Sequence, residues 1–227
     1  MLILSVDTSG RQGSIALANS VTDSLTVMEI VPLAGRSYSA RFIPELSALL
    51  ARHSVGKHEL DAFAVVAGPG SFTGLRVGLA AVKALAEVAA RPIAAVSMLE
   101  AIAAQAAHDG RVTAALDAGR GEVYVGEYEF CREGPALLRE FLMSYEQFAT
   151  LLNGTPGAEL ITPDPSVAAI AAAHLYVRQI DWPDAGKIAR LGFDKIRAGR
   201  TVAPDVLEAN YIRRSDAEIF SAPPKDR

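Results

Sequence analysis

Apolar residues recur along the first half of the chain with two periods, one typical of strands and one typical of helices. Continuous or alternating apolar runs predict strands at 2–7, 14–18, 25–31, 61–68 and 92–96. Helical periodicity predicts helices at 39–53, 73–90 and 97–108. Pro44 lies inside the first predicted helix, so we expect that helix to begin near it or to bend there.

The second half repeats this order. The pattern predicts strands at 112–119, 121–130, 136–144 and 159–162, and helices at 145–152, 165–174 and 183–199. The strand-ending Asp7 of "VDTSGRQGSIAL" has a counterpart in Asp117 of "LDAGRGEVYVG". Two such βββαβα units predict an α/β fold built from two like domains joined by duplication.

We place the domain boundaries from the same pattern. The N-terminal domain covers 1–105, the C-terminal domain covers 106–205, and a segment follows at 206–227. The end of that segment is rich in Pro, Lys and Asp, so we expect it to be disordered.

Composition narrows the class of protein. Half of the 227 residues are apolar and 21% are charged, which suits a globular protein with a sizeable core. The net charge of −4 does not by itself attract nucleic acid. Cys131 is the only cysteine, which excludes intramolecular disulfides and cysteine metal clusters. The N-terminus lacks the features of a signal peptide and no stretch reaches membrane-helix length, so we expect a cytoplasmic protein without membrane contact.

The stretch "VVAGPGSFTGLRVG", residues 65–78, joins a predicted strand to a predicted helix through a glycine-rich turn. Such turns can cradle phosphate, because free N–H groups and the helix dipole point at the anion. Alternatively, the glycines only allow the tight turn. The Gly-Lys-Ser/Thr ending of a Walker loop does not occur in this stretch.

Four motifs together resemble one family. They are "DTS" at 7–9, "GPGSFTGLRVG" at 68–78, "DAGRGEVY" at 117–124 and "LEANYIR" at 207–213. In this order they resemble the bacterial TsaB family, which acts in tRNA threonylcarbamoyladenosine biosynthesis and has the actin-like ATPase (ribonuclease H-like) fold. The resemblance implies a non-catalytic subunit that docks on and activates the catalytic paralogue TsaD, with the small ATPase TsaE joining. It also implies a homodimer in isolation and contact with tRNA only through the complex.

The resemblance to the actin-like superfamily implies a nucleotide cleft, either vestigial or binding ATP or ADP with Mg²⁺ weakly. Its candidate residues are Asp7, Thr8, Ser9, Gly68, Gly70, Ser71, Thr73 and Asp117. In a working member the two aspartates would hold Mg²⁺ through water. Alternatively, each carboxylate accepts N–H bonds from its own hairpin turn.

The catalytic paralogue carries a His-x-x-x-His metal motif in the helix after this region. The resemblance places those two positions on Met98 and Ile102. An isoleucine has no lone pair, and a thioether suits soft ions only. We therefore expect no metal site and no catalytic residue in this chain.

The predicted helix at 73–90 is apolar on more than one side and rich in small residues. Such a helix either is buried completely or packs against a partner. The resemblance favours a partner interface, with candidate residues Leu75, Gly78, Ala81, Val82 and Leu85.

Two other functions remain open at this stage. One is a small ATP-dependent kinase or ATPase that uses its own cleft, and the other is a metallopeptidase. Two groups of charged residues have solvated surfaces as their simplest interpretation. They are the cluster Tyr211, Arg213 and Arg214, and the helix residues Lys187, Arg190, Lys195, Arg197 and Arg200.

Overall fold

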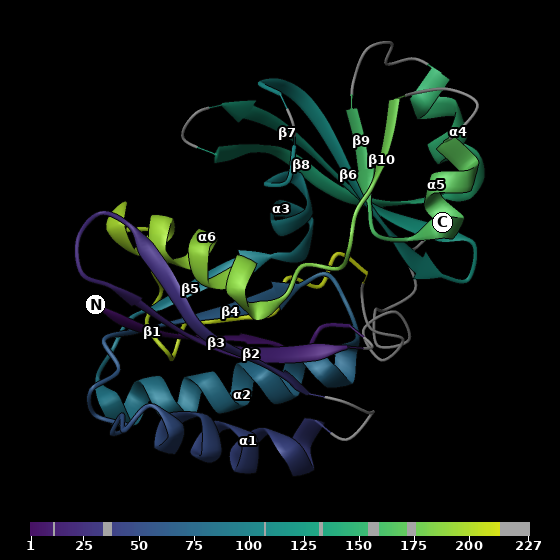
Figure 1. The fold of residues 1–227 in the computed structure, drawn as a ribbon. Helices are drawn as coiled ribbons and strands as arrows, with labels where there is room; N and C mark the ends of the chain where they lie inside the picture. The colour runs from purple at the N-terminus through teal and green to yellow at the C-terminus, as the bar shows by residue number, and fades with distance from the viewer. Residues whose placement is uncertain are drawn as a thin grey trace, which may run out of the picture.

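The computed structural model describes residues 1–10, 12–33, 38–106, 108–131, 134–153, 159–171 and 176–213. Among these residues, the strands form two five-stranded sheets whose topologies match strand for strand (Figure 1). Within the same described ranges, no helix combines the length and the apolar character that crossing a membrane requires.

The first sheet has the order β3-β2-β1-β4-β5. Its strands are β1 (Leu2–Asp7), β2 (Gly13–Ser20), β3 (Leu25–Leu33), β4 (Ala62–Gly68) and β5 (Ile93–Ser97). The first three strands pair antiparallel, whereas β4 lies parallel to both β1 and β5. This sheet agrees with the strands that the apolar pattern predicts in the first half.

The second sheet has the equivalent order, β8-β7-β6-β9-β10, with the same directions of pairing. Its strands are β6 (Gly110–Gly119), β7 (Glu122–Cys131), β8 (Gly134–Ser144), β9 (Glu159–Thr162) and β10 (Tyr176–Gln179). The α/β fold of two duplicated units is therefore confirmed. The strand β10 was not predicted, because its four residues are too few to show a period.

The helices lie in three layers (Figure 1). Helices α1 (Tyr38–Arg52) and α2 (Phe72–Ala89) cover the outer face of the first sheet, and α4 (Tyr145–Asn153) and α5 (Pro165–Ala171) cover that of the second. Helix α1 begins at Tyr38 and continues through Pro44, so the predicted start near this proline is wrong.

The two central helices, α3 (Met98–Ala103) and α6 (Ala185–Arg197), exchange between the halves. Helix α3 follows β5 of the first sheet yet packs on β6 and β7, and α6 follows β10 yet packs on all strands of the first sheet. Although α6 falls within the range 106–205 assigned to the second domain, its packing partners belong to the first. Each sheet is therefore covered on its inner face by a helix from the other half.

Strand β6 shows how this arrangement divides the core. Ala114 and Leu116 face the larger core between the sheets, whereas the intervening Ala115 faces a smaller core with Phe148 and Val167. Successive strand residues point to opposite faces, so a strand with helices on both sides is apolar throughout.

Close packing of α6 on β4 predicts that Gly192→Ala destabilises the protein. A Cβ at Gly192 would lie 2.4 Å from the Cβ of Ala64. Such overpacking costs about 1–3 kcal/mol, more than the roughly 1 kcal/mol that alanine gains over glycine in a helix. Urea unfolding should therefore show a net loss of stability. The control is Gly10→Ala, where a Cβ meets no atom closer than 3.9 Å. If Gly192→Ala is as stable as the control, α6 does not need this close approach.

Candidate functional site

The turn after β1 is held together by its own side chains. The Asp7 carboxylate accepts hydrogen bonds from Ser9 N at 2.8 Å and Ser9 Oγ at 2.7 Å. The Thr8 hydroxyl donates to the Gly74 carbonyl at 2.7 Å. Asp7 is only 2% exposed, and burial raises its pKa to about 6 against the opposing effect of the two Ser9 hydrogen bonds. The side chains of residues 7–9 are thus used to close the turn.

The glycine-rich loop packs directly on this turn. Ser71 N donates to the Ser9 carbonyl at 2.7 Å, and Ser71 Oγ accepts from Gly74 N at 3.3 Å as the N-cap of α2. A Cβ at Gly74 would lie 2.0 Å from the Thr8 carbonyl oxygen, and one at Gly70 would lie 2.6 Å from that of Ser9. These glycines therefore permit contact between two stretches of the chain's own backbone.

The other side of the loop is covered by a C-terminal strap, which we define as residues 202–213. Val202 pairs with Ile93 of β5, and Asn210 N donates to the Ala67 carbonyl at 2.7 Å. Gly68 has a φ of +133°, and a Cβ there would lie 2.5 Å from the Asn210 carbonyl oxygen. The backbone of residues 67–70 is thus in contact with the chain on both sides.

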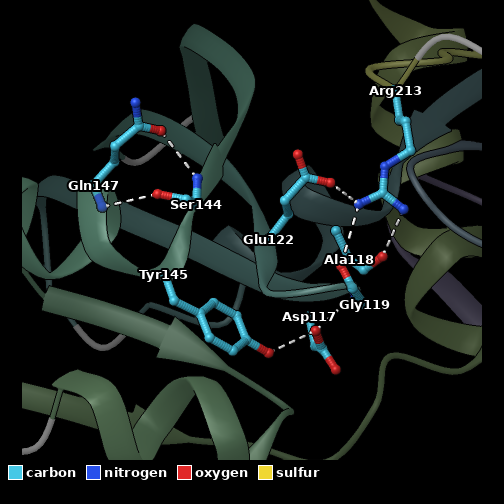
Figure 2. A network of polar contacts seen from close by, with 8 residues as sticks. All are labelled: Asp117, Ala118, Gly119, Glu122, Ser144, Tyr145, Gln147 and Arg213. Carbon is cyan, nitrogen blue, oxygen red and sulfur yellow. Dashed lines mark hydrogen bonds and ion pairs between the residues drawn. The ribbon is translucent and has the colours of Figure 1, made fainter.

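The turn of the second half, between β6 and β7, is likewise bonded to its own residues and to the strap (Figure 2). Asp117 Oδ1 accepts from Gly119 N and from the Tyr145 hydroxyl, both at 2.8 Å. The guanidinium of Arg213 donates to the Ala118 carbonyl at 2.9 Å, to the Gly119 carbonyl at 3.3 Å and to the Glu122 carboxylate. An arginine of the strap therefore sits on the turn that carries Asp117.

A polar cluster around Glu140 of β8 joins the two halves. Its carboxylate accepts hydrogen bonds from Ser97 Oγ, from the Tyr128 hydroxyl at 2.5 Å and from Asn210 Nδ2 at 2.7 Å. Burial and the neighbouring Glu140 charge raise the pKa of Tyr128 above its usual range. Asn210 thus bonds to Ala67 in the first half through its backbone and to Glu140 in the second through its side chain.

The structure brings most of the predicted cleft residues together. The side chains or backbone of Asp7, Thr8, Ser9, Gly68, Gly70 and Ser71 lie at one corner of the first sheet. Thr73 is exposed in the first turn of α2, and Asp117 lies on the second sheet with partners from its own half. Both aspartates accept an N–H bond from their own hairpin, which is the alternative to a metal-binding role.

Three of the five predicted interface residues require a correction. Leu75 and Val82 are at most 2% exposed and Gly78 is buried too, because this side of α2 packs on β1 and β4. Ala81 and Leu85 are half-buried at the edge of that contact. The solvent-exposed residues of α2 are instead Phe72, Thr73, Arg76, Ala80, Ala84, Glu87 and Val88.

The two positions aligned with the metal motif of the paralogue lie in α3. Met98 and Ile102 are both fully buried, in the layer between the sheets. Within the part of the chain that the structure describes, no three His, Cys, Asp or Glu side chains gather as a metal site would require.

The sequence did not predict the roles of Asn210, Arg213 and Glu140. The motif "LEANYIR" did mark the strap, but a motif does not reveal which surface its residues touch. Arg214, grouped with Arg213 in the sequence, lies outside the described residues.

Comparisons with known proteins agree on one family. The family model "TsaD: tRNA N6-adenosine threonylcarbamoyltransferase" matches residues 29–183. The tRNA threonylcarbamoyladenosine biosynthesis protein TsaB of Bacillus subtilis is 37% identical over 131 residues, which cover 57% of this chain and 56% of that protein. The TsaB protein of Escherichia coli is 36% identical over 132 residues, or 57% and 55% of the two chains. These matches span little more than half the length of each relative.

A solved structure extends the likeness to nearly the whole chain. YeaZ from Pseudomonas aeruginosa superimposes with a TM-score of 0.75 at 25% identity, covering 92% of this chain and 100% of that one. The actin-like fold expected from the motifs is thereby supported over both halves.

The buried carboxyl of Asp7 predicts a pH-dependent effect of Asp7→Asn. Because burial raises the folded-state pKa of Asp7 to about 6, well above the ordinary value of an aspartate carboxyl, the native state favours the protonated form. Its contribution to stability is complete below pH 3.8 and is lost as the pH rises through 6. Asparagine stays neutral. The free energy of unfolding of Asp7→Asn, relative to that of wild type, should therefore increase by about 2 kcal/mol between pH 4 and pH 7.5.

The measurement is urea unfolding of both proteins at the two pH values. Asp205→Asn, which changes an exposed carboxyl, serves as the control and should show no such growth. A difference between Asp7→Asn and wild type that does not change with pH would mean that Asp7 is ionised in the native state throughout.

Proposed function

Because the chain belongs to the TsaD family of tRNA N6-adenosine threonylcarbamoyltransferases, we propose that it acts in tRNA threonylcarbamoyladenosine biosynthesis as a non-catalytic subunit. Its proposed partner is the catalytic paralogue TsaD, which it activates by docking, with the small ATPase TsaE joining the assembly. In isolation, we propose that the chain pairs with a second copy of itself.

The observation that supports this proposal is that the glycine-rich loop is already in contact with other parts of the chain's own backbone. A phosphate would need the N–H groups and the space in front of this loop. Ser71 N is bonded to Ser9, and the Asn210 carbonyl lies against Gly68. The chain's own backbone thus takes up contacts that a nucleotide would make, which favours a scaffold over a kinase or an ATPase.

The residues aligned with the metal motif support the same conclusion. The thioether of Met98 and the aliphatic side chain of Ile102 fill the core between the sheets. Replacing them with ligands would bury two polar imidazoles in an apolar layer, which is unfavourable without partners. The metallopeptidase hypothesis therefore finds no support at these positions.

Docking needs a surface, and the exposed face of α2 is the best candidate. Ala80 and Ala84 are small, and Val88 is 67% exposed. Small side chains allow another backbone to approach closely, and an apolar stripe on a surface helix gains stability when a partner covers it. This face replaces the buried residues Leu75, Gly78 and Val82 as the proposed contact.

We expect Ala84→Arg to weaken pairing with TsaD by roughly tenfold or more, equivalent to about 1.4 kcal/mol, since it places a long charged side chain in the contact. The matched control is Ala169→Arg, at an exposed alanine of α5 on the second sheet. Isothermal titration with purified TsaD measures the pairing, and circular dichroism verifies that both variants fold.

Activity is then measured in a reconstitution with TsaD, TsaE, tRNA, threonine, bicarbonate, ATP and the adenylate-forming enzyme. Modified adenosine should require this chain and should fall with Ala84→Arg but not with Ala169→Arg. Full modification without the chain, or ATP hydrolysis by the chain alone, would overturn the proposed role. Normal pairing of Ala84→Arg would move the interface away from α2.

A further inference from the structure

A groove runs along α6, at the opposite end of β6 and β7 from the Asp117 turn. A cavity of about 880 Å³ lies between α6, α3 and the tip where β7 meets β8. A second cavity of about 550 Å³ continues it toward β10, and Gln105 and Lys187 line both. The first sheet separates this groove from α2, as Figure 1 shows for the two helices.

Positive charge is concentrated along the groove, although the chain as a whole carries a net charge of −4. Among the described residues that line the larger cavity, the cations are Lys187, Arg190, Arg197 and Arg200, and the carboxylates are Asp109 and Asp194. The three cations on α6 itself spread over about 15 Å of helix axis. The opposite face of the helix is buried against the first sheet, so its charged face is directed to the groove.

Half of these cations have no carboxylate beside them. Arg197 forms an ion pair with Asp23 at 3.1 Å, and Asp194 lies close enough to Arg197 and Arg200 to interact with both electrostatically. Lys187, in contrast, donates to the neutral amide of Gln105, and Arg190 donates to the Leu25 carbonyl at 3.3 Å. Within the described residues, neither Lys187 nor Arg190 has an ion-pair partner, so each keeps its charge available for an anion.

We propose that this groove binds the phosphate backbone of RNA. A small phosphate compound would need cations that converge on one point, whereas these are spread along a helix as a polymer of phosphates requires. Phe130 lines the same cavity and offers an aromatic surface on which a base can stack. The choice of RNA rests on the proposed function. From the sequence, contact with tRNA was expected only through the complex, and the groove would add a direct contact between RNA and this chain.

The test uses the full chain and a fluorescent RNA stem-loop of the anticodon-arm type, followed by fluorescence anisotropy across a salt series. The variant is Arg190→Gln/Arg200→Gln, which removes two exposed cations of the groove. The matched control is Arg41→Gln/Lys57→Gln, which removes two exposed cations elsewhere. Thermal unfolding verifies that both are folded, and Lys187→Gln provides a second, single change in the groove.

We expect the groove variant to bind roughly tenfold or more weakly at 0.1 M salt, with a salt slope reduced by about 1.4, and the control to bind like wild type. Lys187→Gln should weaken binding by a smaller factor. RNA binding that is absent in wild type, or equal in the groove variant and the control, would overturn the proposal. So would displacement of the RNA by tripolyphosphate as effectively as by unlabelled RNA, since the ligand would then be a small phosphate.

The outcome is independent of the α2 interface. Ala84→Arg should bind the RNA normally even though it pairs poorly with TsaD, because α2 lies on the other side of the first sheet. A wild-type chain that pairs with TsaD but does not bind the RNA would reject the groove alone. A wild-type chain that binds the RNA but does not pair with TsaD would reject the proposed docking alone.

Discussion

The structure depends on how closely the first turns of α2 approach the end of β1. A Cβ at Gly74 would lie 2.0 Å from the Thr8 carbonyl, so a side chain at this position would push the helix off the sheet. Because the contact is between backbones, it fixes both the position and the rotation of α2. The rotation buries Leu75 and Val82 and leaves Ala84 and Val88 in solvent. A single close contact thus determines both how the glycine loop is filled and which face of α2 is free.

The two halves are joined more firmly than a linker between domains would join them. Helices α3 and α6 each pack on the sheet of the other half, and the strap bonds to both through Asn210. The hydrogen bonds that Glu140 accepts from Ser97, Tyr128 and Asn210 link β5, β7, β8 and the strap at one point. Opening the space between the halves would break this cluster and expose the apolar core around α3, at a cost in hydrophobic free energy. The arrangement therefore favours one fixed geometry.

The sequence predicted the local structure well, since long periodic segments and glycine turns report directly on strands and helices. Prediction from the sequence failed where one residue pattern is compatible with two different structures. An alanine-rich helix such as α2 is apolar on several sides, so periodicity does not reveal which side meets the sheet, and Gly78 was placed at the surface. The position of α6 on the first sheet is set by packing across the whole chain, which no local signal encodes. The short strand β10 depends on its pairing with β9 rather than on its own residues.

The candidate site shows a more general limit of motifs. Asp7, Ser9 and the glycines of the loop would be needed to hold a phosphate, and they are equally needed to close the turn and let the backbones meet. The same residues are therefore compatible both with a cleft that binds a nucleotide and with one that the chain's own backbone occupies. The residues that distinguish these two possibilities are far away in the sequence. Asn210 packs against Gly68, and Arg213 bonds to the turn that carries Asp117. A contact made by a residue from a distant segment of the sequence can be seen only in the folded structure, and here such contacts are what the proposed scaffold role rests on.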